Sequence, residues 1–142
     1  MNQHKTMIYP ILVDRLCALY GWPDLFEEGY AKGITVEKIL KYPPKSAYIV
    51  DRHRTESYRW YMGRVRFFYE RLLAGHSLDP ICIDNVCDGE HIYPEPVVID
   101  GHHRLTAAYL AKVPTIPATY GGLVSLRNYL TGHRKTVPSE AA

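Results

Sequence analysis

The chain has 142 residues, of which 46% are hydrophobic and 23% are charged. These values are typical of a globular domain and argue against disorder, while a net charge of +2 is too small to indicate nucleic-acid binding by itself. No apolar run approaches the roughly 20 residues that a membrane-spanning helix needs, and the N-terminus has no signal-peptide pattern. The three cysteines form an odd count. We therefore expect a cytoplasmic, thiol-reduced protein without membrane contacts.

Residues 1–45 are predicted to form an N-terminal helical extension. The first helix is expected after Pro10, because Leu12, Leu16 and Leu19 follow at helical spacing. Gly21 is placed to end this helix. Asp24 and Glu27 resemble a capping box for a second helix, which Gly33 would close. Thr35 is expected to cap a third helix over residues 36–42. The double proline at 43–44 ends the extension.

The next segment is predicted to begin a second domain, over residues 46–133. Residues 47–51 have the pattern of a short strand. Residues 58–72 carry the clearest amphipathic helix pattern, which Gly75 would end. Its apolar stripe consists of Tyr58, Tyr61, Met62, Val65, Phe68, Tyr69 and Leu72.

The remaining elements alternate between strand and helix patterns. Strands are expected over 80–86 and 96–99, a helix over 102–112, a broken strand over 113–120 and a last helix over 123–130. Residues 134–142 are predicted to be a flexible tail. This order indicates an α+β (mixed α/β) fold.

The turn Asp100-Gly101-His102-His103-Arg104 is the most informative segment for function. A strand that runs through Gly101 into a helix presents free backbone N–H groups, which favour phosphate oxygens. Histidines and an arginine at this position would add hydrogen-bond donors, and Asp100 is placed to bind Mg²⁺ or act as a base. The alternative is structural: Asp100 caps the helix and the other side chains are solvated.

The order of these elements resembles the ParB/sulfiredoxin superfamily over roughly residues 46–120. The resemblance rests on a helix leading into Gly75-His76-Ser77-Leu78-Asp79-Pro80-Ile81, a strand hairpin, the Asp-Gly-His-His-Arg turn, an alanine-containing helix and an Ile-Pro strand. It implies a small mixed sheet flanked by helices, with the N-terminal extension outside the match. It also implies that the turn binds nucleotide phosphates, with His102, His103 and Arg104 in contact with phosphate and Gly101 shaping the turn.

Departures from the family pattern narrow the implied chemistry. His102 stands where sulfiredoxin-like proteins carry the catalytic cysteine, so sulfinic-acid reduction is not expected. The Glu and first Arg of the ParB motif are both His in this chain, and no downstream DNA-binding region is expected, so a CTP-dependent clamp is not expected either.

The turn is most similar to that of the free serine kinases, which implies phosphoryl transfer from ATP or another nucleotide with Mg²⁺. Asp100 and His102 are then the catalytic candidates in the turn. Those enzymes also use a carboxylate near the start of the preceding helix as a base, and Glu56 is the best match, with Asp51 second. The alternative for Glu56 is a first-turn acid stabilised by the helix dipole.

Arginines are also concentrated around the helix predicted over 58–72. Together with tyrosine and tryptophan side chains they suit nucleic acid, although most of these aromatic residues belong to the apolar stripe. The candidate nucleic-acid contacts are Arg54, Arg59, Arg64, Arg66 and Arg71.

A zinc site is a weaker possibility in the sequence. Cys82, Cys87 and His91, with His76 as a fourth ligand, have no standard finger spacing, and Cys82 is expected to be a small buried residue of a strand.

Three functions thus stay open. The leading hypothesis is a nucleotide-binding protein that hydrolyses NTP or transfers a phosphoryl group with Mg²⁺. The second is a nucleic-acid-binding or nuclease-like accessory protein of a mobile element. The third is a non-catalytic interaction module.

Overall fold

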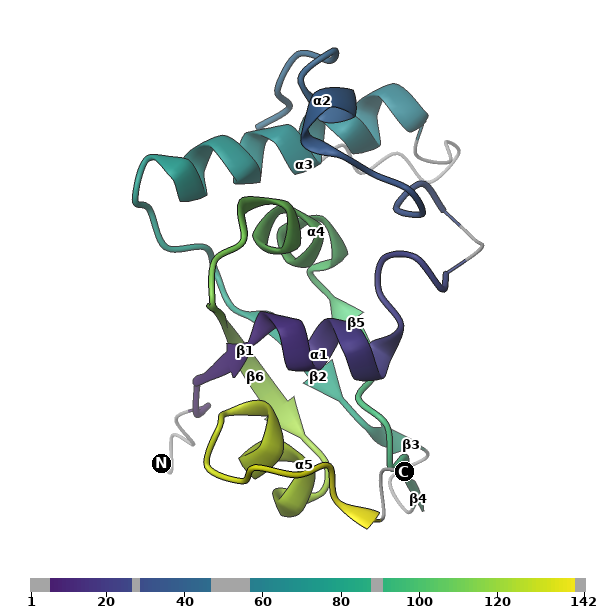
Figure 1. Ribbon diagram of the computed structural model, residues 1–142, viewed down its shortest axis with the longest axis vertical. Helices are drawn as coiled ribbons and strands as arrows, with labels where there is room; N and C mark the ends of the chain where they lie inside the picture. The colour runs from purple at the N-terminus through teal and green to yellow at the C-terminus, as the bar shows by residue number, and fades with distance from the viewer. Residues whose placement is uncertain (1–5, 27–28, 47–56, 88–90, 140–142) are drawn as a thin grey trace, which may run out of the picture.

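The computed structural model describes residues 6–26, 29–46, 57–87 and 91–139. It confirms the predicted α+β class, because helices flank a mixed four-stranded sheet (Figure 1). The strand predicted over 47–51 lies outside the described residues. Within the described ranges, no helix is long and apolar enough to cross a membrane.

The sheet has the strand order β1-β6-β2-β5, with bounds Tyr9–Leu12, Thr115–Gly121, Ile81–Asp84 and Val98–Asp100. The two central strands, β6 and β2, run parallel, and each edge strand is antiparallel to its neighbour. Alternate residues of the central strands are buried, as expected for strands with one face toward the core: Ile81 and Ile83 in β2, and Ile116 and Ala118 in β6. A separate hairpin pairs β3 (Val86–Cys87) with β4 (His91–Ile92).

The N-terminal segment differs from its prediction, because it contributes a strand as well as helices. Leu12, predicted to begin a helix, ends β1, and α1 (Val13–Tyr20) follows directly. Pro10 fits because β1 is an edge strand, where a missing N–H donor is tolerated. The leucine spacing did not reveal this strand, since only pairing with β6 defines it. The predicted end of α1 is confirmed: Gly21 has a left-handed φ of 75°.

The second predicted helix is wrong for the residues that the structure describes. Residues 21–25 form turns, and the carboxylate of Asp24 accepts the backbone N–H of Gly33 at 3.2 Å instead of capping a helix; Glu27 lies outside the described residues. The third prediction is confirmed in part. Thr35 Oγ1 accepts the Lys38 N–H at 3.2 Å and caps α2, which is only four residues long (Val36–Ile39).

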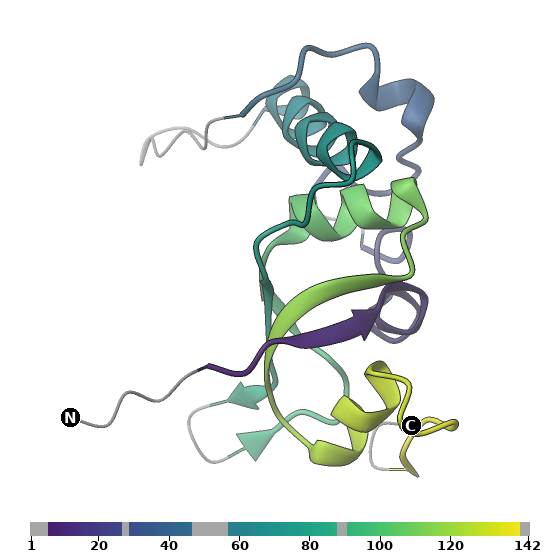
Figure 2. The same ribbon diagram turned by 90° about the vertical axis from the view of Figure 1, so that its left-hand side faces the viewer.

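Two long helices stack at one end of the sheet. The amphipathic pattern forms α3 (Tyr58–Leu73), capped by Ser57, and its stripe residues Tyr61, Met62 and Val65 are buried. Helix α4 (His102–Ala111) lies between α3 and the sheet, as Figures 1 and 2 show from two directions. The stacking places the start of α4 beside α3.

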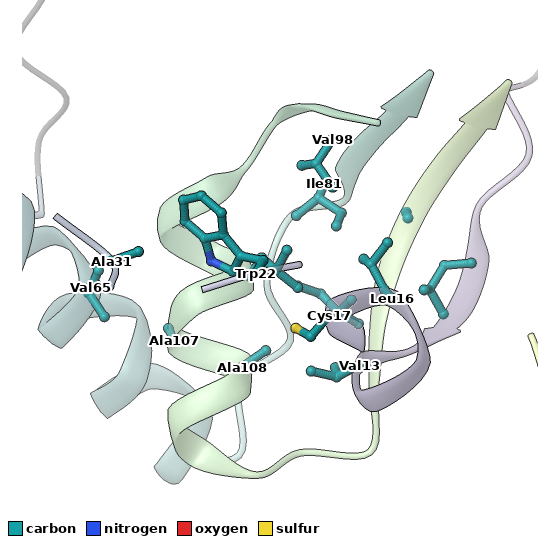
Figure 3. Close-up of a cluster of buried hydrophobic side chains, with 14 of the residues drawn as sticks. Val13, Leu16, Cys17, Trp22, Ala31, Val65, Ile81, Val98, Ala107 and Ala108 are labelled. Atoms are coloured by element: carbon teal, nitrogen blue, oxygen red, sulfur yellow. The ribbon is translucent and has the colours of Figure 1, made fainter. Parts of the chain in front are cut away.

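The core extends from the sheet to α4 (Figure 3). Ala107 and Ala108 are fully buried, so these small side chains allow α4 to approach its neighbours closely. Cys17 of α1 lies in the same cluster, where burial first and nearby Asp14 second raise the pKa of its thiol to about 12. Cys17 is therefore a small neutral core residue.

The C-terminal residues are tied back to α1. Helix α5 (Val124–Leu130) follows β6, and Arg15 Nη1 donates to the carbonyls of Tyr129 and Arg134 at 2.7 and 2.8 Å. Arg134, the first residue of the tail predicted over 134–142, is therefore hydrogen-bonded to α1.

Lys112, the residue that ends α4, has a strained backbone, because its φ of 56° lies in the left-handed region. That conformation costs a non-glycine residue about 1–2 kcal/mol of folding free energy. Glycine avoids this cost, but it loses part of the gain because its unfolded chain has more conformational freedom. We expect Lys112→Gly to raise the free energy of unfolding by about 0.5–1 kcal/mol in urea denaturation. Lys112→Ala keeps the Cβ and should give no such gain; an equal gain would show that the lysine side chain, and not the backbone, is the cause.

Candidate functional site

The turn before α4 is built around Gly101. This residue is the N-cap of the helix, with a φ of 101°, and a Cβ placed on it would collide with Cγ2 and Cβ of Ile81 in β2. Glycine is therefore required both by the backbone conformation and by contact with the neighbouring strand. Asp100 does not occupy the N-cap position, which belongs to Gly101, so the alternative in which Asp100 is the cap residue is wrong.

Asp100 pairs with Arg104 instead. Arg104 Nη2 lies 3.3 Å from Asp100 Oδ2, one helical turn away, in an ion pair whose aspartate side chain is 74% exposed while that of the arginine is 14% exposed. Arg104 Nη1 donates to the carbonyls of Asp79 and Pro80. The guanidinium thus connects the turn to the segment that precedes β2.

His102 and His103 lie in different surroundings. His102 Nε2 is 2.8 Å from Tyr20 Oη, and the imidazole lies 4.8 Å from the Trp22 ring, on the side of α4 that faces the end of α1. Burial, followed by the nearby His103, lowers the pKa of His102, and Asp100 acts in the opposite direction. His102 is therefore a neutral, half-buried side chain at pH 7.

His103 faces α3. Its ring lies 4.9 Å from that of Tyr61 and 5.8 Å, edge-on, from that of Trp60. Tyr61 Oη is in turn 3.2 Å from the buried Thr106 Oγ1. The His103 ring thus packs against aromatic residues of α3.

A pocket of about 480 Å³ lies between α3 and the start of α4. Cationic side chains from both helices and two carboxylates line it, together with serine, phenylalanine and leucine residues and the turn glycine. The lining residues are Ser46, Arg64, Phe67, Phe68, Arg71, Ser77, Leu78, Asp79, Asp100, Gly101, His103 and Arg104. The predicted phosphate-binding residues Gly101, His103 and Arg104 are brought together here with Asp100, whereas His102 is not among the lining residues.

The predicted nucleic-acid arginines of α3 separate into different roles. Arg64 and Arg71 line the pocket, and Arg59 is exposed. Arg66 is used internally: it pairs with Glu70 at 3.0 Å and donates to the carbonyls of Leu40 and Tyr42. Arg54, Glu56 and Asp51 lie outside the described residues.

Arg64 also hydrogen-bonds to the backbone at residues 45–46, at the edge of the pocket. Its Nη1 donates to the carbonyls of Lys45 and Ser46 at 3.2 and 2.7 Å, and its guanidinium carbon lies 4.4 Å from the centre of the Phe68 ring. The charge is thus held in place over an aromatic face at the pocket wall.

Several lining residues were not identified as site residues from the sequence. Ser77 and Asp79 belong to the turn between α3 and β2, and Phe67 and Phe68 lie on α3. The Leu78-Asp79-Pro80 segment was visible as a motif, but only the pairing of β2 with β5, which sets Cys82 opposite Asp100, places it against the Asp100–Arg104 turn.

The proposed zinc ligands are described only in part. Cys82 lies in β2, with a half-buried free thiol, and His76 and His91 are exposed; nothing is described for the Cys87 side chain. Among the described residues, no group of three or more His, Cys, Asp or Glu side chains is arranged to hold a metal ion.

Fold and site together define an α+β protein with a mixed four-stranded sheet and a cation-lined pocket at the start of one helix. Comparisons with protein-family models, with curated proteins and with solved structures each found no match for this chain.

Proposed function

We propose that the pocket between α3 and α4 binds the phosphate groups of a nucleotide. The observation that carries the proposal is that three arginines and a histidine line one pocket at the start of α4: Arg64, Arg71, His103 and Arg104. A helix N-terminus favours anions, and cations from a second helix strengthen that preference. The volume, about 480 Å³, lies in the range of small-molecule sites.

The proposal includes a magnesium ion in the same pocket. Asp79 and Asp100 both line it, and Mg²⁺ in nucleotide sites is commonly held by one or two carboxylates together with phosphate oxygens and water. The bound ion would neutralise phosphate charge. The residues of this chain would then orient the phosphates through His103 and Arg71 and keep the metal beside them through the carboxylates.

The proposed reaction class is NTP hydrolysis or phosphoryl transfer, with ATP as the first nucleotide to test. Asp100 is the catalytic candidate with the best support, because its carboxylate lines the pocket and is largely exposed. His102 has less support, since its ring contacts Tyr20 and Trp22. Glu56 stays a prediction. The resemblance to the ParB/sulfiredoxin superfamily and a cytoplasmic location belong to the same proposal.

Nucleic-acid binding has less support than nucleotide binding. Arg66 is engaged with α2 and the residues around it, and Arg64 and Arg71 line the concave pocket. Arg66 would therefore be missing from an extended basic surface along α3.

Nucleotide binding should raise the melting temperature of the protein, because a ligand that binds only the folded state stabilises it by about 2.7 kcal/mol at 100 times its Kd. We expect ATP, ADP, CTP or GTP at millimolar concentration to increase Tm, and Mg²⁺ to enlarge the increase. Arg71→Gln should reduce the shift, whereas Arg59→Gln, an exposed position of the same helix that does not line the pocket, should leave it unchanged. No shift with any nucleotide would refute the proposed function.

A further inference from the structure

The side chain of Arg104 is largely occupied by contacts within the protein. Its Nη1 donates to the carbonyl of Asp79 at 2.8 Å and to that of Pro80 at 2.7 Å, and its Nη2 donates to Asp100 at 3.3 Å. A guanidinium has five N–H groups, so three of them are used in these bonds. With 14% of its side chain exposed, Arg104 differs from a typical surface arginine.

These bonds hold one wall of the pocket against the start of α4. Ser77, Leu78 and Asp79 line the pocket between the end of α3 and the start of β2, and Leu78 anchors them with only 6% of its surface exposed. Hydrogen bonds from a charged donor are about twice as strong as neutral ones. Arg104 therefore joins the wall at residues 77–80 to the Asp100–Gly101 turn.

Arg71 has a different geometry. It lies near the end of α3, is exposed, and lines the same pocket, with its guanidinium carbon 5.7 Å from the centre of the Phe67 ring. An anion bound at this side would not have to replace the two carbonyl contacts that Arg104 makes. Binding to Arg104 Nη1 would deprive the Asp79 and Pro80 carbonyls of this charged donor.

We propose that Arg104 is a positioning residue for this pocket, and that Arg71 and His103 contact the anion. This assignment rests on the proposed nucleotide function. Arg104 acts indirectly, by holding the wall at residues 77–80 in place. Arg71 provides the increase in affinity as the number of phosphates increases.

The affinity of full-length variants for AMP, ADP and ATP with MgCl₂, measured by titration calorimetry, separates the two roles. Arg71→Gln should weaken ATP binding about tenfold and AMP binding much less, because a direct contact with the added negative charge is lost. Arg104→Gln should weaken all three nucleotides by the same factor. Arg104→Lys, which keeps the charge but not the planar fork, should behave like Arg104→Gln.

The mobility of the wall gives a readout that needs no ligand. In Arg104→Lys and Arg104→Gln, NMR order parameters of the amides of residues 77–79 should fall toward the flexible range, below about 0.6, while Arg71→Gln leaves them unchanged. Order parameters unchanged in both Arg104 variants would overturn the proposal, as would an Arg104→Gln protein that selectively loses its preference for ATP over AMP. If wild-type protein binds none of the nucleotides, the proposed function fails, and the order parameters alone then decide the role of Arg104 in holding the wall.

Discussion

Gly101→Ala should lower the free energy of unfolding by about 3 kcal/mol in urea denaturation. The left-handed φ of 101° costs an alanine about 1–2 kcal/mol, and its Cβ would overlap Cγ2 and Cβ of Ile81, which adds about 1–3 kcal/mol of overpacking. The change would also displace the first turn of α4 from β2. We therefore expect the Tm shift caused by nucleotides to decrease in the same variant.

Gly75 is the matched control for this substitution. It has a similar φ of 84°, but a Cβ placed on it would meet no heavy atom within 4 Å. Gly75→Ala should therefore cost only the backbone term of about 1–2 kcal/mol. If Gly101→Ala is no more destabilising than Gly75→Ala, contact with Ile81 does not restrict the turn. Combining Gly101→Ala with Ile81→Ala should cost less than the sum of the two single changes, because the smaller side chain removes the Cγ2 overlap.

Thr106→Val should lower the free energy of unfolding by about 2–3 kcal/mol. Thr106 is fully buried, and its hydroxyl accepts the indole N–H of Trp22 at 2.9 Å, donates to the His102 carbonyl at 2.7 Å and lies 3.2 Å from Tyr61 Oη. Valine has nearly the same shape but no hydroxyl, so the buried indole N–H would lose this acceptor, at a cost of about 1–3 kcal/mol. The bond to Tyr61 would be lost as well.

Thr106→Ser tests whether the hydroxyl is responsible. Serine keeps the oxygen and removes one methyl group, so we expect a loss of only about 1 kcal/mol. Because Tyr61 contacts the His103 ring, Thr106→Val should also shift the imidazole NMR signals of His103, whereas Thr106→Ser should leave them close to those of the wild type. Equal destabilisation by serine and valine would show that packing, and not hydrogen bonding, sets the contribution of this residue.

Local patterns were sufficient for much of the secondary structure. The helix of residues 58–73 has a long, regular apolar stripe, and the glycines at 21 and 75 adopt the positive φ values expected of residues that end helices. Thr35 caps its helix as its residue type and position suggested. Such features depend on residues within a few positions of one another, so a single sequence contains them.

The incorrect predictions involve partners distant in the sequence. Pairing with β6, more than 100 residues away, makes residues 9–12 a strand, and a bond to Gly33 takes Asp24 away from helix capping. Asp100 is an exception, because it contacts Arg104 only one helical turn away, and the N-cap position of α4 belongs to Gly101.

At the turn of residues 100–104, local sequence and tertiary contacts again determined different features. From the sequence alone, Gly101 and its polar neighbours were expected to form a strand-to-helix turn with an exposed helix start, because the residue types and their order determine that conformation. Only the tertiary structure decided that His103 and Arg104 line a pocket with Arg71, while His102 contacts Tyr20 and Trp22. The physical reason is that adjacent residues at the start of a helix point in directions about 100° apart, and the elements packed on each side determine what each one meets.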